Sequence, residues 1–229
     1  MTAQQEDDFK SGYAKLRRKE GGARRYYNRL MKAPLLRRCP YCYDRQVSEI
    51  DHYLPRSSFA RLAVVPLNLV PLCHGCNKQK LNYAPSPSRP PLLHPYFDFA
   101  ESEQWIGSSL DEDNFVTTFY VNVPAPWDED TRKRVENHFE VMKLGQFWSG
   151  SAAVYFSTVW ARLLRIYRAS GVFAVQDYLL EEAELVVEGH AEPWKFALLM
   201  AWAESEWFCE CRWRGLIMVE LELLLDDDY

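Results

Sequence analysis

The sequence predicts an α+β protein in which a small cysteine-stapled module lies between basic N-terminal helices and a mainly α-helical C-terminal region. Two Cys-x-x-Cys pairs with 30 residues between them predict the module. Apolar residues recur at helical spacing over 152–169 and 172–188, whereas residues 114–123 alternate with the period of a strand. Hydrophobic residues make up 48% and charged residues 26%, as in ordinary folded domains. We therefore expect three parts: a basic helical arm over residues 1–38, the module over 39–95, and a mainly helical region over 96–229.

The four paired cysteines predict a structural zinc site. Zinc takes four soft ligands in a tetrahedron, and two Cys-x-x-Cys turns supply them once the fold brings the turns together. The expected ligands are Cys39, Cys42, Cys73 and Cys76. This use of cysteine indicates metal binding rather than disulfides, and we expect the remaining pair, Cys209 and Cys211, to be buried free thiols.

Polar residues between and just after the cysteine pairs suit a second, hard cation. Asp51 and His52 are adjacent, Asn68 follows, and Asn77 comes directly after the second pair. Carboxylate and amide oxygens suit Mg²⁺ or Mn²⁺, and a neutral histidine can accept a proton from water. An isolated Asp-His pair is more often a turn residue beside a packed imidazole. The surrounding cysteine frame favours the functional interpretation here.

The order of these residues over 38–81 resembles the HNH nuclease family, of the kind stapled by four cysteines. The resemblance implies a ββα-metal fold, in which a β-hairpin and a helix present one divalent cation to a phosphodiester. It makes His52 the general base, Asp51 and Asn77 the ligands of a catalytic Mg²⁺ or Mn²⁺, and Asn68 the brace of the hairpin loop that orients His52. The implied activity is a metal-dependent endonuclease, with double-stranded DNA as the expected substrate.

The charge distribution favours a nucleic-acid partner. The net charge is −5, yet residues 10–38 hold eleven basic side chains opposed only by Glu20. That block carries +10 and the rest of the chain −15, an asymmetry typical of phosphate binding. The alternative is a solvated helix face. The expected nucleic-acid contacts are Arg17, Arg18, Arg24, Arg25, Arg56, Lys78 and Lys80.

Local patterns place the elements. We expect a loose start over 1–9 and a proline-rich linker over 85–91. Residues 215–225 fit a helix or a strand, with helix favoured, either buried in the core or exposed for a partner. Expected strands are 46–52, 64–70 with Asn68 inside it, and 114–123, which pairs with 102–106 or with a partner. Expected helices are 9–19, 23–32, 76–82, 131–144, 152–169, 172–188 and 193–211.

A second, shorter resemblance concerns residues 93–98, Leu-His-Pro-Tyr-Phe-Asp. Similar peptides follow the cysteine pairs in bacterial HNH proteins of Septu-type and retron-associated anti-phage systems. The resemblance implies a defence role beside an ATPase partner of the ABC class. For His94 we expect packing against the module rather than contact with the catalytic centre.

Two other classes of function remain open. One is a non-catalytic zinc finger that binds nucleic acid or protein, although Asp51, His52 and Asn77 are not needed for binding alone. The other is a scaffolding subunit that uses the tryptophan-rich C-terminal region. The sequence shows neither the apolar core of a signal peptide nor a run long enough to span a bilayer, so we expect a cytoplasmic protein without membrane association.

Overall fold

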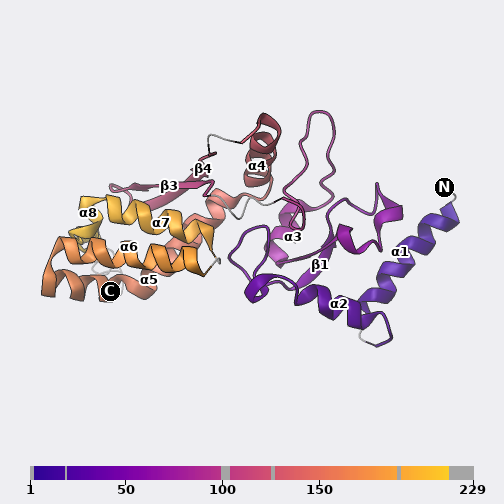
Figure 1. Cartoon of the computed structure of the whole chain (residues 1–229), viewed down its shortest axis with the longest axis horizontal. Coiled ribbons are helices and arrows are strands. Elements are labelled where there is room, and N and C mark those ends of the chain that lie inside the picture. Colours follow the sequence, from indigo (N-terminus) through magenta and orange to yellow (C-terminus); the bar gives the residue numbers. More distant parts are fainter. Residues whose placement is uncertain (1–2, 19, 99–103, 125–126, 190–191, 217–229) are drawn as a thin grey trace, which may run out of the picture. The chain divides into compact units, whose positions relative to one another are not determined.

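The computed structural model describes residues 3–18, 20–98, 104–124, 127–189 and 192–216. The chain divides into two compact units (Figure 1). The first comprises Met1–Glu103 and Val123–Leu144, and the second Gln104–Asn122 and Gly145–Tyr229. The described residues combine helices with two small antiparallel sheets, which confirms the α+β class. The part expected to be one helical region from residue 96 is shared between the units.

Two helices begin the first unit and pack on its sheet. Helix α1 spans Ala3–Arg17, so it begins within the stretch expected to be loose, and α2 spans Arg24–Met31. Gly21 adopts a φ of 112° at the turn between them, a conformation that favours glycine. Their shared apolar cluster consists of Tyr13, Ile50 and Leu69, with Leu16, Tyr27, Leu30 and Met31 packed against it.

The centre of the first unit runs strand, strand, helix. Strand β1 (Glu49–His52) pairs antiparallel with β2 (Leu69–Leu72), and α3 (His74–Lys80) follows at once. The loop between the strands contains two 3₁₀ turns, η2 (Ala60–Leu62) and η3 (Pro66–Asn68), and another, η1 (Leu35–Arg37), precedes the first cysteine pair. The second strand is therefore shorter than expected. Asn68 lies in the turn before it, because Pro66 at the start of η3 fits a helical turn.

The proline-rich stretch folds back within the first unit instead of acting as a spacer. The Tyr83 hydroxyl and the Asn137 Nδ2 both donate to the Pro90 carbonyl, at 2.6 and 2.8 Å. Asn137 lies on α4 (Glu129–Val141), whose Arg134 forms an ion pair with Asp98. The expectation of a linker was wrong, because Pro90 and Asp98 contact residues of α4 that lie 47 and 36 positions away in the chain.

The second unit packs helices and a hairpin around tryptophans. Strand β4 (Val116–Val121) confirms the alternating pattern, but its partner is β3 (Ile106–Asp111) rather than 102–106. The predicted helix over 193–211 breaks at Ser205, whose hydroxyl caps the Phe208 amide. The helices are α5 (Leu144–Ser170), α6 (Val172–Glu188), α7 (Pro193–Glu204) and α8 (Glu206–Cys209).

Buried side chains join the elements of the second unit. Trp202 is 2% exposed and donates through Nε1 to the Thr117 hydroxyl at 3.0 Å, which ties α7 to the hairpin. Cys209 and Cys211 are buried free thiols, as predicted. In the segment predicted over 215–225, residues 217–225 lie outside the described part. None of the described helices is long and apolar enough to cross a membrane.

Candidate active site and metal centre

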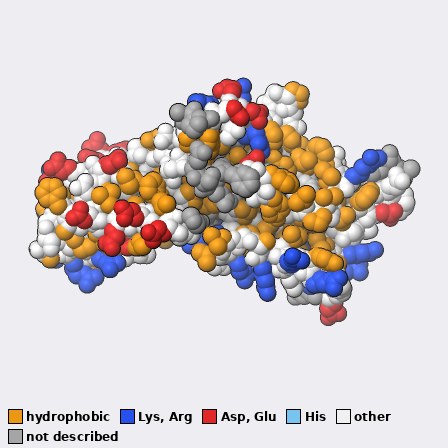
Figure 2. Space-filling model, in the orientation of Figure 1, with side chains coloured by type: hydrophobic (Ala, Val, Ile, Leu, Met, Phe, Trp, Pro, Cys, Tyr) orange, Lys and Arg blue, Asp and Glu red, His pale blue; other side chains and the backbone are white. Residues whose placement is uncertain are grey.

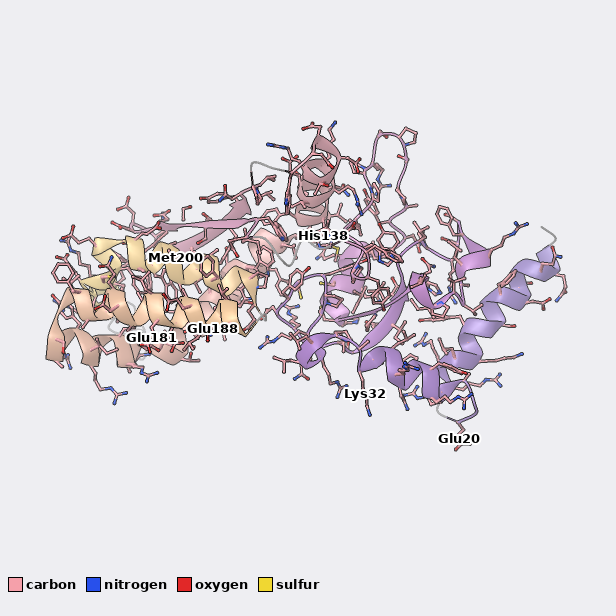
Figure 3. The ribbon with its side chains drawn as sticks, viewed as in Figure 1. Glu20, Lys32, His138, Glu181, Glu188 and Met200 are labelled. Atoms are coloured by element: carbon pink, nitrogen blue, oxygen red, sulfur yellow. The ribbon has the colours of Figure 1, made fainter. Side chains whose placement is uncertain are left out.

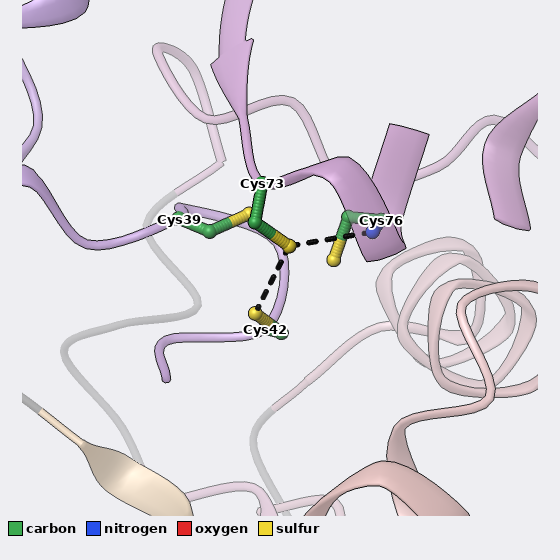
Figure 4. A group of neighbouring side chains, drawn as sticks. All are labelled: Cys39, Cys42, Cys73 and Cys76. Atoms are coloured by element: carbon green, nitrogen blue, oxygen red, sulfur yellow. Dashed lines mark hydrogen bonds between the residues drawn. The ribbon is translucent and has the colours of Figure 1, made fainter. Parts of the chain in front are cut away.

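The four paired cysteines meet in the first unit (Figure 4). Their Sγ atoms all lie within 4.8 Å of one another, and Cys42 Sγ is 3.9 Å from Cys73 Sγ. A tetrahedron with Zn–S bonds of about 2.3 Å has sulfur–sulfur edges of about 3.8 Å. All four side chains are at most 2% exposed, so the cluster is closed to solvent. Spacing, donor chemistry and burial fit a structural zinc site.

Backbone geometry explains how each cysteine reaches the cluster. Cys73 caps α3, because its Sγ accepts the Cys76 amide at 3.3 Å. The surrounding thiols of Cys39, Cys42 and Cys76 lower the pKa of Cys73, which favours the thiolate that binds metal. In the first pair, the Cys39 amide donates to the Arg45 carbonyl at 2.7 Å and closes the turn.

Helix α4 supports the first cysteine pair from far along the chain. His138 is 1% exposed, and its Nε2 donates to the Tyr41 carbonyl at 3.1 Å. Figure 3 shows His138 on α4, at the end of the helix that meets the body of the unit. Burial lowers the pKa of His138 to about 4, so the ring is neutral at physiological pH. His138 is thus a packed histidine.

His52 ends strand β1 with a defined tautomer. It is 3% exposed, and its Nε2 lies 2.9 Å from the Ala63 carbonyl oxygen. A carbonyl only accepts, so Nε2 carries the proton and Nδ1 of the neutral ring is the acceptor. Nδ1 lies 3.7 Å from Asp51 Oδ1. The free lone pair of His52 is therefore on the side of Asp51.

Asp51 forms an ion pair that no sequence pattern indicated. Lys80 Nζ lies 2.9 Å from Asp51 Oδ2, and the lysine side chain is only 1% exposed. Lys80 was expected on the nucleic-acid surface, but it is buried under the site instead. Burial alone would raise the pKa of Asp51, yet the adjacent Lys80 ammonium lowers it below its ordinary value. Asp51 is thus a stable carboxylate, with Oδ1 left for a cation.

Asn68 is buried and braces the loop between the strands. Its Oδ1 accepts the Leu54 amide at 2.7 Å, and its Nδ2 donates to the Leu54 and Leu62 carbonyls, both at 3.1 Å. Leu62 directly precedes Ala63, whose carbonyl receives the His52 proton. The amide thereby fixes the segment that sets the tautomer of His52.

Asn77, Asp51 and His52 line one open cleft of about 370 Å³. Asn77 follows the last cysteine on α3, so the zinc site and the cleft share one short helix. Hard oxygen donors from Asp51 and Asn77 on one cleft fit a divalent cation such as Mg²⁺. The other lining residues are Pro55, Arg56, His74, Lys78, Lys80, Leu81 and Asn82.

The basic residues predicted to contact nucleic acid differ in their exposure to solvent. Figure 2 shows lysine and arginine side chains gathered over α1 and α2. Arg24 is half-buried, with its guanidinium 4.3 Å from the Tyr27 ring centroid. Arg17, Arg18, Arg25, Arg56 and Lys78 are exposed.

Two further side chains have roles that the sequence showed only in part. His94 packs against the module as expected, with Nε2 3.0 Å from the Leu67 carbonyl. Tyr13 is buried, and its ring centroid lies 4.4 Å from that of His52. The helical spacing of Phe9, Tyr13 and Leu16 indicated a packed helix face. Nothing in that pattern indicated which residue Tyr13 would contact.

The fold and site define an α+β protein whose four-cysteine cluster fits zinc and adjoins a His-Asp-Asn cleft. The chain is similar to Protein ea31 of Escherichia phage lambda, with 29% identity over 213 residues. The similarity covers 84% of this chain and 70% of that protein. Since that share exceeds either compact unit, it takes in parts of both. No protein-family model matches the sequence, and no solved structure matches the chain.

Proposed function

We propose that this protein is a metal-dependent endonuclease of the HNH type, which hydrolyses phosphodiester bonds with double-stranded DNA as the expected substrate. One observation carries the proposal. The Ala63 carbonyl holds the proton of His52 on Nε2, which leaves Nδ1 as a proton acceptor beside Asp51 on an open cleft.

The cleft residues divide the hydrolysis between them. Nδ1 of His52 accepts a proton from the water whose oxygen attacks phosphorus, and the departing oxygen takes up a proton as its bond to phosphorus breaks. Asp51 and Asn77 would hold a divalent cation, which supplies charge neutralisation at the phosphate when bound. Arg56 and Lys78 are exposed on the same cleft and orient the phosphate.

The basic surface of α1 and α2 supports a nucleic-acid substrate. Arg17 and Arg25 are exposed on these helices, Arg18 is exposed directly after α1, and α2 has no buried residue. The exposed ring of Tyr26 lies beside the Arg25 guanidinium, 4.9 Å from centroid to Cζ. Such a surface binds phosphates without reading sequence, so we expect binding that weakens steeply with salt.

The test compares His52→Ala with wild type in plasmid cleavage under Mg²⁺, Mn²⁺ or EDTA, with zinc measured in each sample. Removing a general base costs about 10²- to 10⁴-fold in rate, while bound zinc should not change. His74→Ala is the matched control, because His74 lies on the same cleft but is 80% exposed and paired with Glu49. Wild-type cleavage by His52→Ala would refute the proposal. A zinc-loaded wild type that binds DNA without cutting it would indicate a binding module.

We extend the proposal to anti-phage defence beside an ABC-class ATPase, which rests on the resemblance of residues 93–98. Leu93 and His94 are buried in the first unit, whereas Phe97 of the same peptide is 55% exposed. The test is co-expression of the chain with its genomic neighbours. We expect an ATPase to copurify and phage plating to fall; unchanged plating would contradict the defence role.

A further inference from the structure

Tyr13 brings helix α1 into direct contact with the proposed general base. Its side chain is 5% exposed, and its hydroxyl donates to the Ile50 carbonyl at 2.5 Å. Ile50 lies two residues before His52 on strand β1. The Tyr13 ring lies against the imidazole, with centroids 4.4 Å apart and planes at 59°. One side chain thus holds both the strand and the ring that the strand presents.

A second contact of α1 reaches the other support of His52. A Cβ on Gly12 would lie 3.0 Å from Val64 Cγ1, so the helix and the loop approach closely at this point. Val64 directly follows Ala63, whose carbonyl holds the Nε2 proton of His52. Helix α1 therefore contacts the segments on either side of the imidazole. A helix that served only to bind DNA would not need either contact.

We propose that Tyr13 is a positioning residue for His52, and that α1 is part of the catalytic centre as well as part of the DNA-binding surface. The inference rests on the proposed function, because it assigns Tyr13 a task in that reaction. The ring does the positioning, since it restricts the plane of the imidazole. The hydroxyl anchors the ring to Ile50, which makes it secondary. Ring and hydroxyl can be separated by substitution.

The test uses Tyr13→Leu, which keeps an apolar side chain but removes the flat ring, and Tyr13→Phe, which removes the hydroxyl alone. Tyr83→Leu is a closely matched control. Tyr83 is 6% exposed and donates to a carbonyl, that of Pro90, at 2.6 Å. It therefore reports the general cost of losing a buried tyrosine from the same unit.

Steady-state cleavage of a labelled duplex separates positioning from binding. Misplacing a catalytic group by about 1 Å costs up to about 100-fold in rate, so we expect kcat of Tyr13→Leu to fall at least about tenfold. KM and the Kd for DNA in Ca²⁺ should stay near the wild-type values. Tyr13→Phe and Tyr83→Leu should keep most of the wild-type kcat. Raised KM with unchanged kcat in Tyr13→Leu, or equal losses in Tyr13→Leu and Tyr13→Phe, would overturn the inference.

A readout that needs no cleavage keeps the inference separate from the proposed function. Nitrogen-15 NMR of the imidazole should show a single Nε2–H tautomer of His52 in wild type and an averaged one in Tyr13→Leu. Tyr83→Leu should match wild type. If wild type proves inactive, the proposed function fails, and this spectrum still decides whether Tyr13 positions His52. An unchanged His52 spectrum in Tyr13→Leu would overturn the positioning role.

Discussion

Replacing Lys80 by methionine should destabilise the cation-free protein and tighten its binding of divalent cations. Methionine keeps the length and apolar volume of the buried side chain but removes the ammonium that lies 2.9 Å from Asp51 Oδ2. Breaking a buried ion pair costs about 3–5 kcal/mol because one charge is left uncompensated. The Asp51 side chain is 24% exposed, so water offsets part of that cost. We expect a loss of about 2–3 kcal/mol in the free energy of unfolding.

The gain in cation affinity follows from the same charge. A single and a double positive charge held about 5 Å apart repel by about 1.7 kcal/mol even at the dielectric constant of water. Without the ammonium, Kd for Mn²⁺ should therefore fall roughly 15-fold. The two effects have opposite signs. If Lys80 had a purely structural role, its removal would lower both the stability of the protein and its affinity for Mn²⁺.

The assay is urea unfolding of the zinc-loaded chain at pH 7.5, with and without Mn²⁺, together with calorimetric Mn²⁺ titration. That pH is far above the range in which Asp51 takes up a proton. The pKa of Asp51 is lowered in the folded state, so its contribution is lost only as the pH falls below its ordinary value of 3.8. Lys78→Met is the control, because Lys78 is exposed on the same helix. Weaker Mn²⁺ binding by Lys80→Met would refute the assignment of Asp51 as the cation ligand.

Three further predictions concern the supports of the site. Asn68→Ala should cost about 2–3 kcal/mol, since three hydrogen bonds to the loop are lost, and should lower kcat without releasing zinc; calorimetry and zinc analysis check this. Cys76→Ser should bind less than the wild-type ratio of about one zinc per chain and should melt at lower temperature, as elemental analysis and thermal unfolding would show. The folded pKa of His138 is about 4 against an ordinary 6.5, so the unfolded chain binds the extra proton and stability falls as the pH drops from 6.5 toward 4. The loss should reach about 3 kcal/mol relative to His138→Gln in parallel acid titrations; equal pH dependence in the two proteins would contradict it.

Sequence patterns predicted the elements well wherever local chemistry decides them. Helix α6 spans Val172–Glu188, the range that apolar spacing gave, and the strand expected within 114–123 is present. The cysteine cluster was predictable because Cys-x-x-Cys turns have few uses apart from metal binding. Asn68 was placed in a strand because the apolar residues Leu67 and Leu69 flank it, as in an alternating strand. That alternation gives no sign of the turn that Pro66 begins.

Contacts between distant parts of the chain could not be predicted in this way. Lys80 looked like a surface lysine because lysines are rarely buried, and its partner Asp51 lies 29 positions earlier. Tyr13 meets Ile50 across 37 positions, a pairing that no local period specifies. In both cases the sequence identified a residue type and a face, and the packing of the first unit determined the partner.

The structural metal and the proposed cation site are coupled through α3. Cys76, Asn77 and Lys80 lie on this one helix of seven residues, and the Cys73 sulfur caps its first turn. A helix of that length does not hold together alone in water, so tertiary contacts must order it. Zinc bound by Cys73 and Cys76 would fix its beginning, and the Lys80–Asp51 ion pair fixes its end. Zinc loss should therefore displace Asn77 from the cleft, whereas removing a divalent cation from the proposed site should leave the cysteine cluster intact. The dependence runs in one direction, because the proposed cation site relies on a helix that the zinc site orders.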